Sequence, residues 1–373
     1  MIYFDSAATT FQKPPTVAAA MRDAMATMTT PGRGGHPAAA RAADTAFSCR
    51  TELAELFGLQ NPEQVVFTEN ATHALNIAIK SLVPPGGSAV ISGYEHNAVT
   101  RPLAALGAKV TVAAAPLFRP DMVVSAFERA VSGKINAVIC NHVSNVFGFI
   151  QPIDEIAAIC RKRHVPLIVD ASQSAGILPV DMTSLGAAFI AMPGHKGLYG
   201  PQGTGVLLCR SENVRPLMEG GTGSLSIQQQ MPDFLPDRLE AGTHNMPGIA
   251  GLLEGVRFVR RRGMDSICDR ERRLTLLMAQ ELQRIRGLRV YALPGLREQA
   301  GVLSVVPEGK DVELIASQLA ERGIAIRAGI HCAPLAHRSA GTLDTGTIRM
   351  SFSDFNTPAE VWRCVDVFRE IFR

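Results

Sequence analysis

The 373-residue sequence predicts an α/β fold, with a large doubly wound domain built on a mainly parallel seven-stranded sheet and a smaller α+β domain. Two observations predict it. Between residues 60 and 210, short apolar runs rich in β-branched residues alternate with segments of helix length, as in parallel sheets covered on both faces. After about residue 245, a long charged segment with helical apolar spacing replaces this alternation.

The alternating region supplies seven predicted strands and several of the helices between them. The strands are expected at residues 65–67, 89–91, 110–113, 137–141, 167–170, 189–191 and 205–209. The helices are expected at residues 71–82, 123–131 and 154–164. Ligands of such sheets bind beyond the carboxyl ends of the strands, so polar residues that follow a strand are the first functional candidates.

The rest of the chain predicts the smaller domain. Its expected helices are 265–285, 311–322 and one that begins after Thr357, and its expected strands lie near Val290 and at 302–306, 324–327 and 348–352. Asp311 suits an N-cap, Gly323 suits a C′ position, and Thr357 and Glu360 form a capping box. We assign residues 13–250 to the large domain, and residues 1–12 and 251–373 to the small domain.

Composition narrows the class of protein. The chain is 46% hydrophobic and 19% charged, which excludes a disordered chain or a coiled coil. A net charge of +3, short basic clusters and 6% aromatic residues argue against nucleic-acid binding.

No apolar run approaches the roughly 18–20 residues that cross a membrane, and no signal-peptide pattern is present, so we expect a cytoplasmic protein without a membrane partner. Seven scattered cysteines form neither a disulfide framework nor a C-x-x-C motif, and no metal site is expected.

Two residues that follow predicted strands have the chemistry of a cofactor site. Asp170 ends a buried strand; it could cap a helix or lie in a solvated turn, or it could pair with a positively charged ring nitrogen. Lys196 lies in the glycine-rich loop 194–201, where the backbone can approach a ligand closely. Lysines are usually solvated surface charges, but an aspartate followed by a lysine at strand ends is what pyridoxal phosphate requires.

A phosphate cradle is expected where a helix opens after the strand at 65–67. The free N–H groups near Ala71 and the Thr72 hydroxyl make this helix end suitable for an anion, although an ordinary cap fits the same residues. His96, just past another strand, could stack on a ring or be a structural histidine.

The ordered set of motifs resembles the cysteine desulfurase and selenocysteine lyase family, specifically its group II branch, among the class V, fold-type I pyridoxal-phosphate enzymes. The motifs cover almost the whole chain, and their order is more specific than any one of them. They are Asp5-Ser6-Ala7-Ala8-Thr9-Thr10, Asn70-Ala71-Thr72, Glu95-His96-Asn97, His142-Val143-Ser144-Asn145, Val169-Asp170-Ala171-Ser172-Gln173, His195-Lys196, Arg327-Ala328-Gly329-Ile330-His331-Cys332-Ala333 and Phe355-Asn356-Thr357.

The resemblance implies a role for each candidate residue. Lys196 would hold pyridoxal phosphate covalently, and Asp170 would bind its ring nitrogen. The other residues implied to bind the cofactor are Ala71, Thr72 and His195 at the phosphate, His96 over the ring, Gln173 at the phenolic oxygen, and Asn145. Thr243 would reach the phosphate in a partner subunit, which implies a homodimer. Asn145 and Arg349, with Arg327 close by, would bind the substrate carboxylate.

Cys332 is the implied sulfur-accepting nucleophile, and His96 and Lys196 are the other implied catalytic residues. Cys332 lies in a loop between His331 and Pro334, with Arg327 upstream. A positive and partly exposed setting lowers the pKa of a thiol and makes its thiolate reactive. The alternative, an inert buried cysteine, is less suited to a loop with few large apolar residues.

Three positions depart from the family's pattern. Pro193 stands where a serine is often found two residues before the His-Lys pair, and Gly197 is an added residue before 198–201. Ile330 replaces the first residue of a histidine pair that usually precedes the nucleophile. We expect these differences to affect substrate preference and sulfur presentation, and to leave the cofactor assignment intact.

The sequence therefore predicts a cysteine desulfurase that converts L-cysteine to L-alanine and leaves a persulfide on Cys332. The alternatives are a selenocysteine lyase that acts on L-selenocysteine, another class V aminotransferase or lyase, and a non-catalytic α/β scaffold or metal-binding module. The sulfur acceptor is open: a carrier protein, a scaffold for iron–sulfur cluster assembly, or a small thiol.

Overall fold

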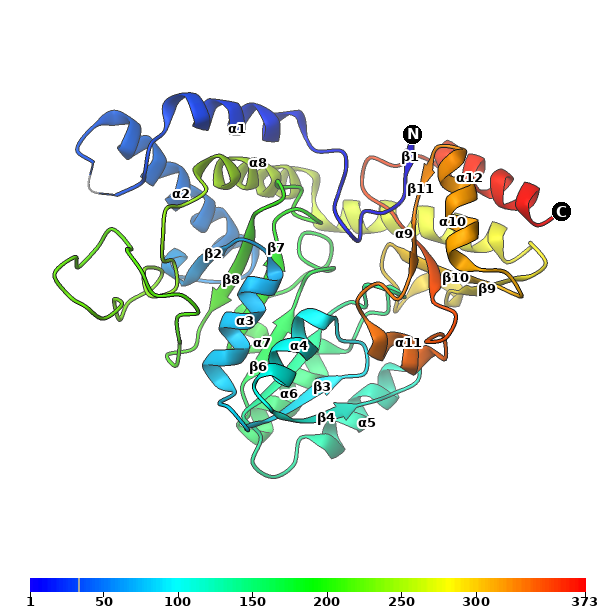
Figure 1. Ribbon diagram of the computed structural model, residues 1–373, viewed down its shortest axis with the longest axis horizontal. Coiled ribbons are helices and arrows are strands. Elements are labelled where there is room, and N and C mark those ends of the chain that lie inside the picture. The colour runs from blue at the N-terminus through cyan, green and yellow to red at the C-terminus, as the bar shows by residue number, and fades with distance from the viewer. Residues whose placement is uncertain (33) are drawn as a thin grey trace.

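The computed structural model describes residues 1–32 and 34–373, and Figure 1 shows the course of the chain. The large domain contains a seven-stranded sheet in the order β2-β8-β7-β6-β5-β3-β4. Its strands are β2 (Val65–Thr68), β3 (Ser88–Ser92), β4 (Lys109–Ala113), β5 (Ala137–Asn141), β6 (Leu167–Asp170), β7 (Phe189–Pro193) and β8 (Gly205–Cys209). Strand β8 alone runs opposite to the other six strands, so the predicted mainly parallel sheet is confirmed.

Helices cover both faces of this sheet, as the doubly wound prediction requires. The helices of the large domain are α1 (Pro15–Thr27), α2 (Pro37–Leu56), α3 (Ala71–Leu82), α4 (Asn97–Ala105), α5 (Pro120–Ala130), α6 (Ile153–Arg163), α7 (Met182–Leu185) and α8 (Met246–Arg262), with a 3-10 turn at Pro62–Gln64. α3 and α4 pack on one face, and α2, α5, α6, α7 and α8 pack on the other.

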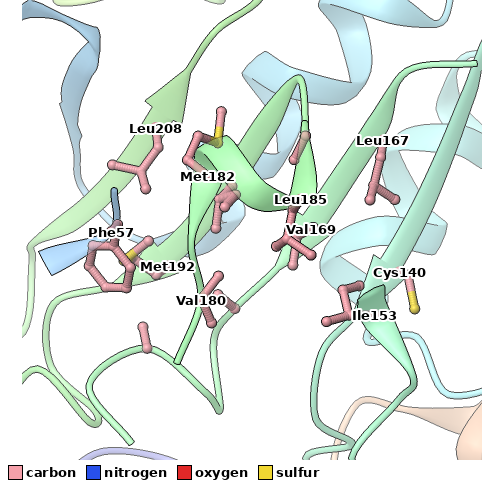
Figure 2. Packing of buried hydrophobic residues seen from close by; sticks show 14 of the residues in the cluster. Phe57, Cys140, Ile153, Leu167, Val169, Val180, Met182, Leu185, Met192 and Leu208 are labelled. Carbon is pink, nitrogen blue, oxygen red and sulfur yellow. The ribbon is translucent and has the colours of Figure 1, made fainter. Parts of the chain in front are cut away.

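Successive residues of each central strand point to opposite faces and so enter two different cores. In β5, Val138 and Cys140 belong to the core under α5 and α6, whereas Ala137 and Ile139 belong to the core under α3. Figure 2 shows part of the first core, in which side chains from β5, β6, β7 and β8 meet those of α6 and α7. Because both faces are buried, these strands read as continuous apolar runs.

Strand β4 departs from this pattern. It lies at the edge of the sheet and pairs only with β3, and its first four residues are exposed. The expectation that a β-branched run marks a strand was therefore right for 110–113, and this strand is an exception to the burial on both faces that most of the runs indicate. Helix α5 begins at Pro120, three residues before its predicted start, because proline is well suited to the first helical turn.

The small domain follows α8 and lies on the right of Figure 1, in yellow to red. Its strands β12 (Arg327–Gly329), β13 (Thr347–Ser351), β10 (Val302–Pro307) and β9 (Leu288–Tyr291) form an antiparallel sheet in that order. Its helices are α9 (Met264–Leu282), α10 (Val312–Glu321), α11 (Pro334–Ala340) and α12 (Pro358–Ile371), with a 3-10 turn at Pro294–Leu296. The side chain of Asp311 caps α10, and the Thr357–Glu360 capping box opens α12, as predicted.

The N-terminus joins the small domain. Strand β1 (Ile2–Tyr3) pairs in parallel with β11 (Ile324–Ala325), and Asp5 forms a bridge with Ser351 of β13. The single strand expected at 324–327 is therefore two strands in two sheets, because Ile324 and Ala325 pair with β1 whereas Arg327 pairs with β13. The predicted boundary between residues 250 and 251 lies inside α8, which packs on α1 and α2, and the division into domains stays a prediction.

Within residues 1–32 and 34–373, no helix combines the length and apolarity that crossing a membrane requires. Over the same residues, no cluster of three or more His, Cys, Asp or Glu side chains is arranged to hold a metal ion.

Candidate active site

The carboxyl ends of the parallel strands surround a cavity of about 180 Å³. Its walls come from the segments that follow β2, β3, β5, β6 and β7, which the fold brings to one edge of the sheet. Eight of the nine predicted cofactor-binding residues line it: Ala71, Thr72, His96, Asn145, Asp170, Gln173, His195 and Lys196. The doubly wound topology thus assembles residues that are more than a hundred positions apart in the chain.

Thr243 is the exception. It is exposed and lines a different cavity of about 170 Å³, together with Thr68, His73 and Glu240. The structure therefore does not place Thr243 in this chain's own cofactor cavity. Its implied role, contact with the phosphate in a partner subunit, stays a prediction.

Asp170 and Lys196 supply opposite charges to the first cavity. Asp170 ends β6, is only 4% exposed, and accepts a hydrogen bond from the Ser172 N–H at 2.9 Å. Burial lowers the pKa of the Lys196 amine to about 8, and the attraction of Asp170 opposes that shift without cancelling it. At pH 7 about a tenth of this amine is therefore uncharged and nucleophilic, far more than for an exposed lysine.

The loop that carries Lys196 is tightly packed against its surroundings. A Cβ atom at Gly197 would lie 2.3 Å from the Ala175 carbonyl oxygen, and one at Gly194 would lie 2.2 Å from Thr204 Oγ1. The Ala175 oxygen belongs to the backbone, so the loop requires glycine at position 197, whereas a side chain at position 194 would have to displace the Thr204 hydroxyl. Gly197, which departs from the family's pattern, is thus a packing requirement of the loop as it stands.

The histidines of the cavity are neutral near pH 7. Burial lowers the pKa of His195 to about 4, and burial also lowers the pKa of His96. His96 caps α4, because its Nδ1 accepts the Ala98 N–H at 3.0 Å. His195 Nδ1 is buried and has no hydrogen-bond partner among the described residues. A buried ring nitrogen without a partner is a vacant position for a ligand's polar group.

The N-terminus of α3 forms another wall. The Asn70 side chain caps the helix by accepting the His73 N–H at 2.9 Å, and the Ala74 N–H bonds to the Asn70 carbonyl. The N–H groups of Ala71 and Thr72 have no partner among the described residues, as is usual in a first helical turn. Backbone donors, the helix dipole and the Thr72 hydroxyl together suit a phosphate group.

A buried carboxylate, a lysine with a lowered pKa and an anion cradle therefore line one cavity. These are the three groups that pyridoxal phosphate needs for its ring nitrogen, its aldehyde and its phosphate. The residues present fit this cofactor.

A second cavity of about 270 Å³ adjoins the first. Ala8, His96, Asn145 and Lys196 line both cavities, and the small domain closes the second with Arg327, His331, Cys332 and Arg349. Cys332 is exposed, whereas the other six cysteines are buried. The predicted nucleophile and the predicted substrate-binding arginines thus face the predicted cofactor lysine across one space.

The two arginines share a carboxylate that the sequence analysis did not single out. Arg349 Nη2 lies 2.7 Å from Asp5 Oδ1, and Arg327 Nη2 lies 3.1 Å from Asp5 Oδ2. The Arg349 side chain is 3% exposed and the Arg327 side chain 52% exposed. The N-terminal motif contained Asp5, and the signal that could have assigned it is that two convergent arginines need a compensating carboxylate.

Two amide side chains already have protein partners. Gln173 Nε2 donates to the Ala7 carbonyl at 2.9 Å, and Asn145 Nδ2 donates to the His331 carbonyl at 2.9 Å. The Asn145 carbonyl accepts Arg349 Nη1 at 2.9 Å, while Asn145 Oδ1 and Arg349 Nε are buried and unpartnered within the described chain. The implied contacts of Gln173 with a phenolic oxygen and of Asn145 with a carboxylate stay predictions.

Comparison with known proteins agrees with this geometry. A family model described as aminotransferase class-V matches residues 2–363. A probable cysteine desulfurase of Xylella fastidiosa (strain 9a5c) is 33% identical, over 98% of this chain and 89% of that protein. A probable cysteine desulfurase of Mycolicibacterium paratuberculosis is 32% identical over 100% of this chain, which spans only 55% of that relative. The apo structure of a cysteine desulfurase from Thermococcus onnurineus NA1 has a TM-score of 0.89 and 30% identity, covering 100% of this chain and 94% of that one.

Proposed function

The chain belongs to the aminotransferase class-V family and is a pyridoxal-phosphate-dependent enzyme, and we propose that it is a cysteine desulfurase. In this reaction L-cysteine becomes L-alanine, and Cys332 collects the sulfur as a persulfide. The observation that carries the proposal is the second cavity, in which Lys196, Arg349 and Cys332 face one space. An amine, a carboxylate-binding group and an exposed thiol are the three groups that this chemistry needs.

Residues of the first cavity would hold the cofactor. Lys196 would bind it covalently, Asp170 would pair with its ring nitrogen, and Thr72, His195 and the N–H groups of Ala71 and Thr72 would bind its phosphate. His96 would stack on the ring, and Gln173, which lines the same cavity, would contact the phenolic oxygen. When bound, the cofactor supplies an electron sink that stabilises negative charge at the substrate's Cα.

The chain's own residues perform the remaining steps. Arg349, assisted by Arg327 and Asn145, orients the substrate carboxylate. The neutral Lys196 amine takes the proton from Cα. Cys332 Sγ attacks the substrate's sulfur, so that an S–S bond forms while the C–S bond breaks and its electron pair stays on carbon. Protonation of that carbon and return of a proton to Cα complete L-alanine.

Product analysis tests the proposal. The loaded enzyme, given L-cysteine and a reductant, should form alanine and sulfide in equal amounts. Parallel assays with selenocysteine and cysteine sulfinate separate the alternatives, because a selenocysteine lyase would turn over selenocysteine at full rate in the Cys332→Ser variant. Absence of alanine from all three substrates would contradict the proposal.

The pKa of Lys196 predicts how cofactor uptake depends on pH. Since burial lowers this pKa to about 8, the neutral fraction of the amine rises with pH and reaches about one half at pH 8. The rate of covalent uptake of pyridoxal phosphate by the apoprotein should rise about tenfold per pH unit below 8 and level off by about pH 9. Absorbance and borohydride trapping measure this rate. A rate that keeps rising to about pH 10, as for an exposed lysine, would contradict the assignment.

The two arginines predict different effects on substrate binding. Arg349→Ala should raise KM for cysteine by about 10- to 100-fold, because a buried charged donor to the substrate carboxylate is lost. Arg327→Ala is the matched control, and it should raise KM only a few-fold because its half-exposed guanidinium is screened by water. Steady-state kinetics check both values. An equal or larger effect of Arg327→Ala would reverse the two roles.

Assembly and location complete the proposal. The protein is a homodimer in which Thr243 contacts the phosphate bound to the partner subunit; the exposure of Thr243 outside this chain's own cofactor cavity supports this. The exposure of Cys332 supports delivery of sulfur to an acceptor protein, for which iron–sulfur cluster assembly is one destination. Seven scattered cysteines in the sequence support a cytoplasmic location.

A further inference from the structure

Cys332 lies in a turn whose backbone is unfavourable for its residues. The Ala333 N–H donates to the Ile330 carbonyl at 3.0 Å, which closes a β-turn with His331 and Cys332 at its centre. Both central residues have a left-handed backbone, with φ of 53° at His331 and 56° at Cys332. Two positive φ values are typical of type I′ turns, which favour Asn, Asp and Gly. A cysteine there needs contacts that hold it.

Two donors of the large domain bind the two carbonyls of this turn. The His331 carbonyl accepts from Asn145 Nδ2 at 2.9 Å, and the Cys332 carbonyl accepts from the Asn97 N–H at 2.8 Å. Asn145 is buried and lines both cavities, and Asn97 is the first residue of α4, directly after His96. The turn itself belongs to the small domain, between β12 and α11.

We propose that the Asn97 N–H and the Asn145 carboxamide are positioning donors that hold the His331–Cys332 turn in its left-handed form and fix Cys332 Sγ at the second cavity. The inference rests on the proposed function, since it concerns the same nucleophile. Both donors are joined to walls of the cofactor cavity, so the position of the thiol is tied to the position of His96 and Asn145. A turn released from either donor would relax toward negative φ and carry Sγ away from the substrate's sulfur.

One backbone donor can be removed without breaking the helix that carries it. Asn97→Pro deletes the N–H, and its ring occupies the space in front of the Cys332 carbonyl. Proline is tolerated at the first helical position, and His96 already has φ −76° and ψ 157°, the extended form that a residue before proline prefers. Asn97→Ala is the matched control, because it removes the side chain and keeps the N–H.

Hydrogen exchange of segment 330–335 in substrate-free protein, measured by mass spectrometry, reports the stability of the turn independently of catalysis. Exchange at the Ala333 amide should be about fivefold to tenfold faster in Asn97→Pro and unchanged in Asn97→Ala, as expected for the loss of one hydrogen bond. Wild-type exchange in Asn97→Pro would overturn the proposal. Equal acceleration in both variants would also overturn it, because the side chain or the helix would then be responsible.

A second variant keeps the test independent of how Asn97→Pro folds, and a kinetic readout adds the effect on catalysis. Asn145→Ala removes the other donor and should speed exchange at the Ala333 amide by a similar factor. Wild-type exchange in Asn145→Ala would overturn the role proposed for the Asn145 carboxamide. In Asn97→Pro, kcat for sulfide release should fall roughly tenfold while KM for cysteine stays within about twofold. If Cys332→Ser retained full activity, the proposed function would fail, but the exchange result would still decide whether these donors hold the turn.

Discussion

Replacing Lys196 by alanine is expected to abolish the cofactor's protein-bound absorbance and to lower alanine formation by at least about 10³-fold. The amine would be lost both as the covalent attachment point and as the base for the Cα proton. The side chain lies where the two cavities meet, and its lowered pKa makes it nucleophilic near neutral pH. Absorbance after dialysis, borohydride trapping and an alanine assay measure the loss.

Lys13 provides a matched control for this variant. Burial lowers its pKa to about 8 as well, but its amine donates to the His195 carbonyl at 3.1 Å and to Thr10. Reactivity alone would not distinguish the two lysines, whereas position does. Lys13→Ala should therefore keep the trapped adduct, and an adduct that survives in Lys196→Ala but is lost in Lys13→Ala would transfer the role to Lys13.

Replacing Cys332 by serine is expected to lower sulfide release from L-cysteine by about 10²- to 10³-fold while the cofactor's absorbance is retained. A serine hydroxyl occupies the same exposed position but does not form the thiolate that attacks sulfur. Cys268→Ala is the control, because that thiol is buried and burial raises its pKa. A Cys332→Ser variant that releases sulfide at the parent rate, under identical reductant, would remove Cys332 from the reaction.

Where local signals are strong, the fold could be predicted from the sequence. Strand β5 and helix α3 have the predicted bounds, and the caps at Asp311 and Thr357 are formed by the predicted residues. A buried strand reads as a continuous apolar run, and a cap involves residues within three positions of one another. Such features need no knowledge of distant parts of the chain.

Helix α8 shows why other elements were not predicted. Its sequence holds several glycines, which lower helix propensity. In the structure these glycines permit close packing: a Cβ at Gly255 would lie 2.3 Å from the Leu198 carbonyl, and one at Gly251 would lie 2.8 Å from Met21 Cγ. Tertiary packing thus stabilises a helix that its own residues disfavour.

The candidate site, too, could be predicted only in part from the sequence. Asp170 and Lys196 could be found because each follows a buried strand, and the family resemblance added the roles of their neighbours. The contact of Asp5 with Arg349 joins residues that are 344 positions apart, and the contact of Asn97 with Cys332 joins two domains. No local pattern encodes such contacts: the first depends on how the N-terminus packs on the small domain, and the second on how the two domains pack together.

The central claim is that Cys332 takes the sulfur atom from the substrate, and peptide mass spectrometry tests it most directly. The loaded enzyme is given L-cysteine without reductant or acceptor, stopped by alkylation and digested. The account predicts one additional sulfur atom on the peptide that contains Cys332, removable by reductant and matched by alanine. Alanine accumulation with an unmodified Cys332 peptide, or with the added sulfur on another cysteine, would contradict it.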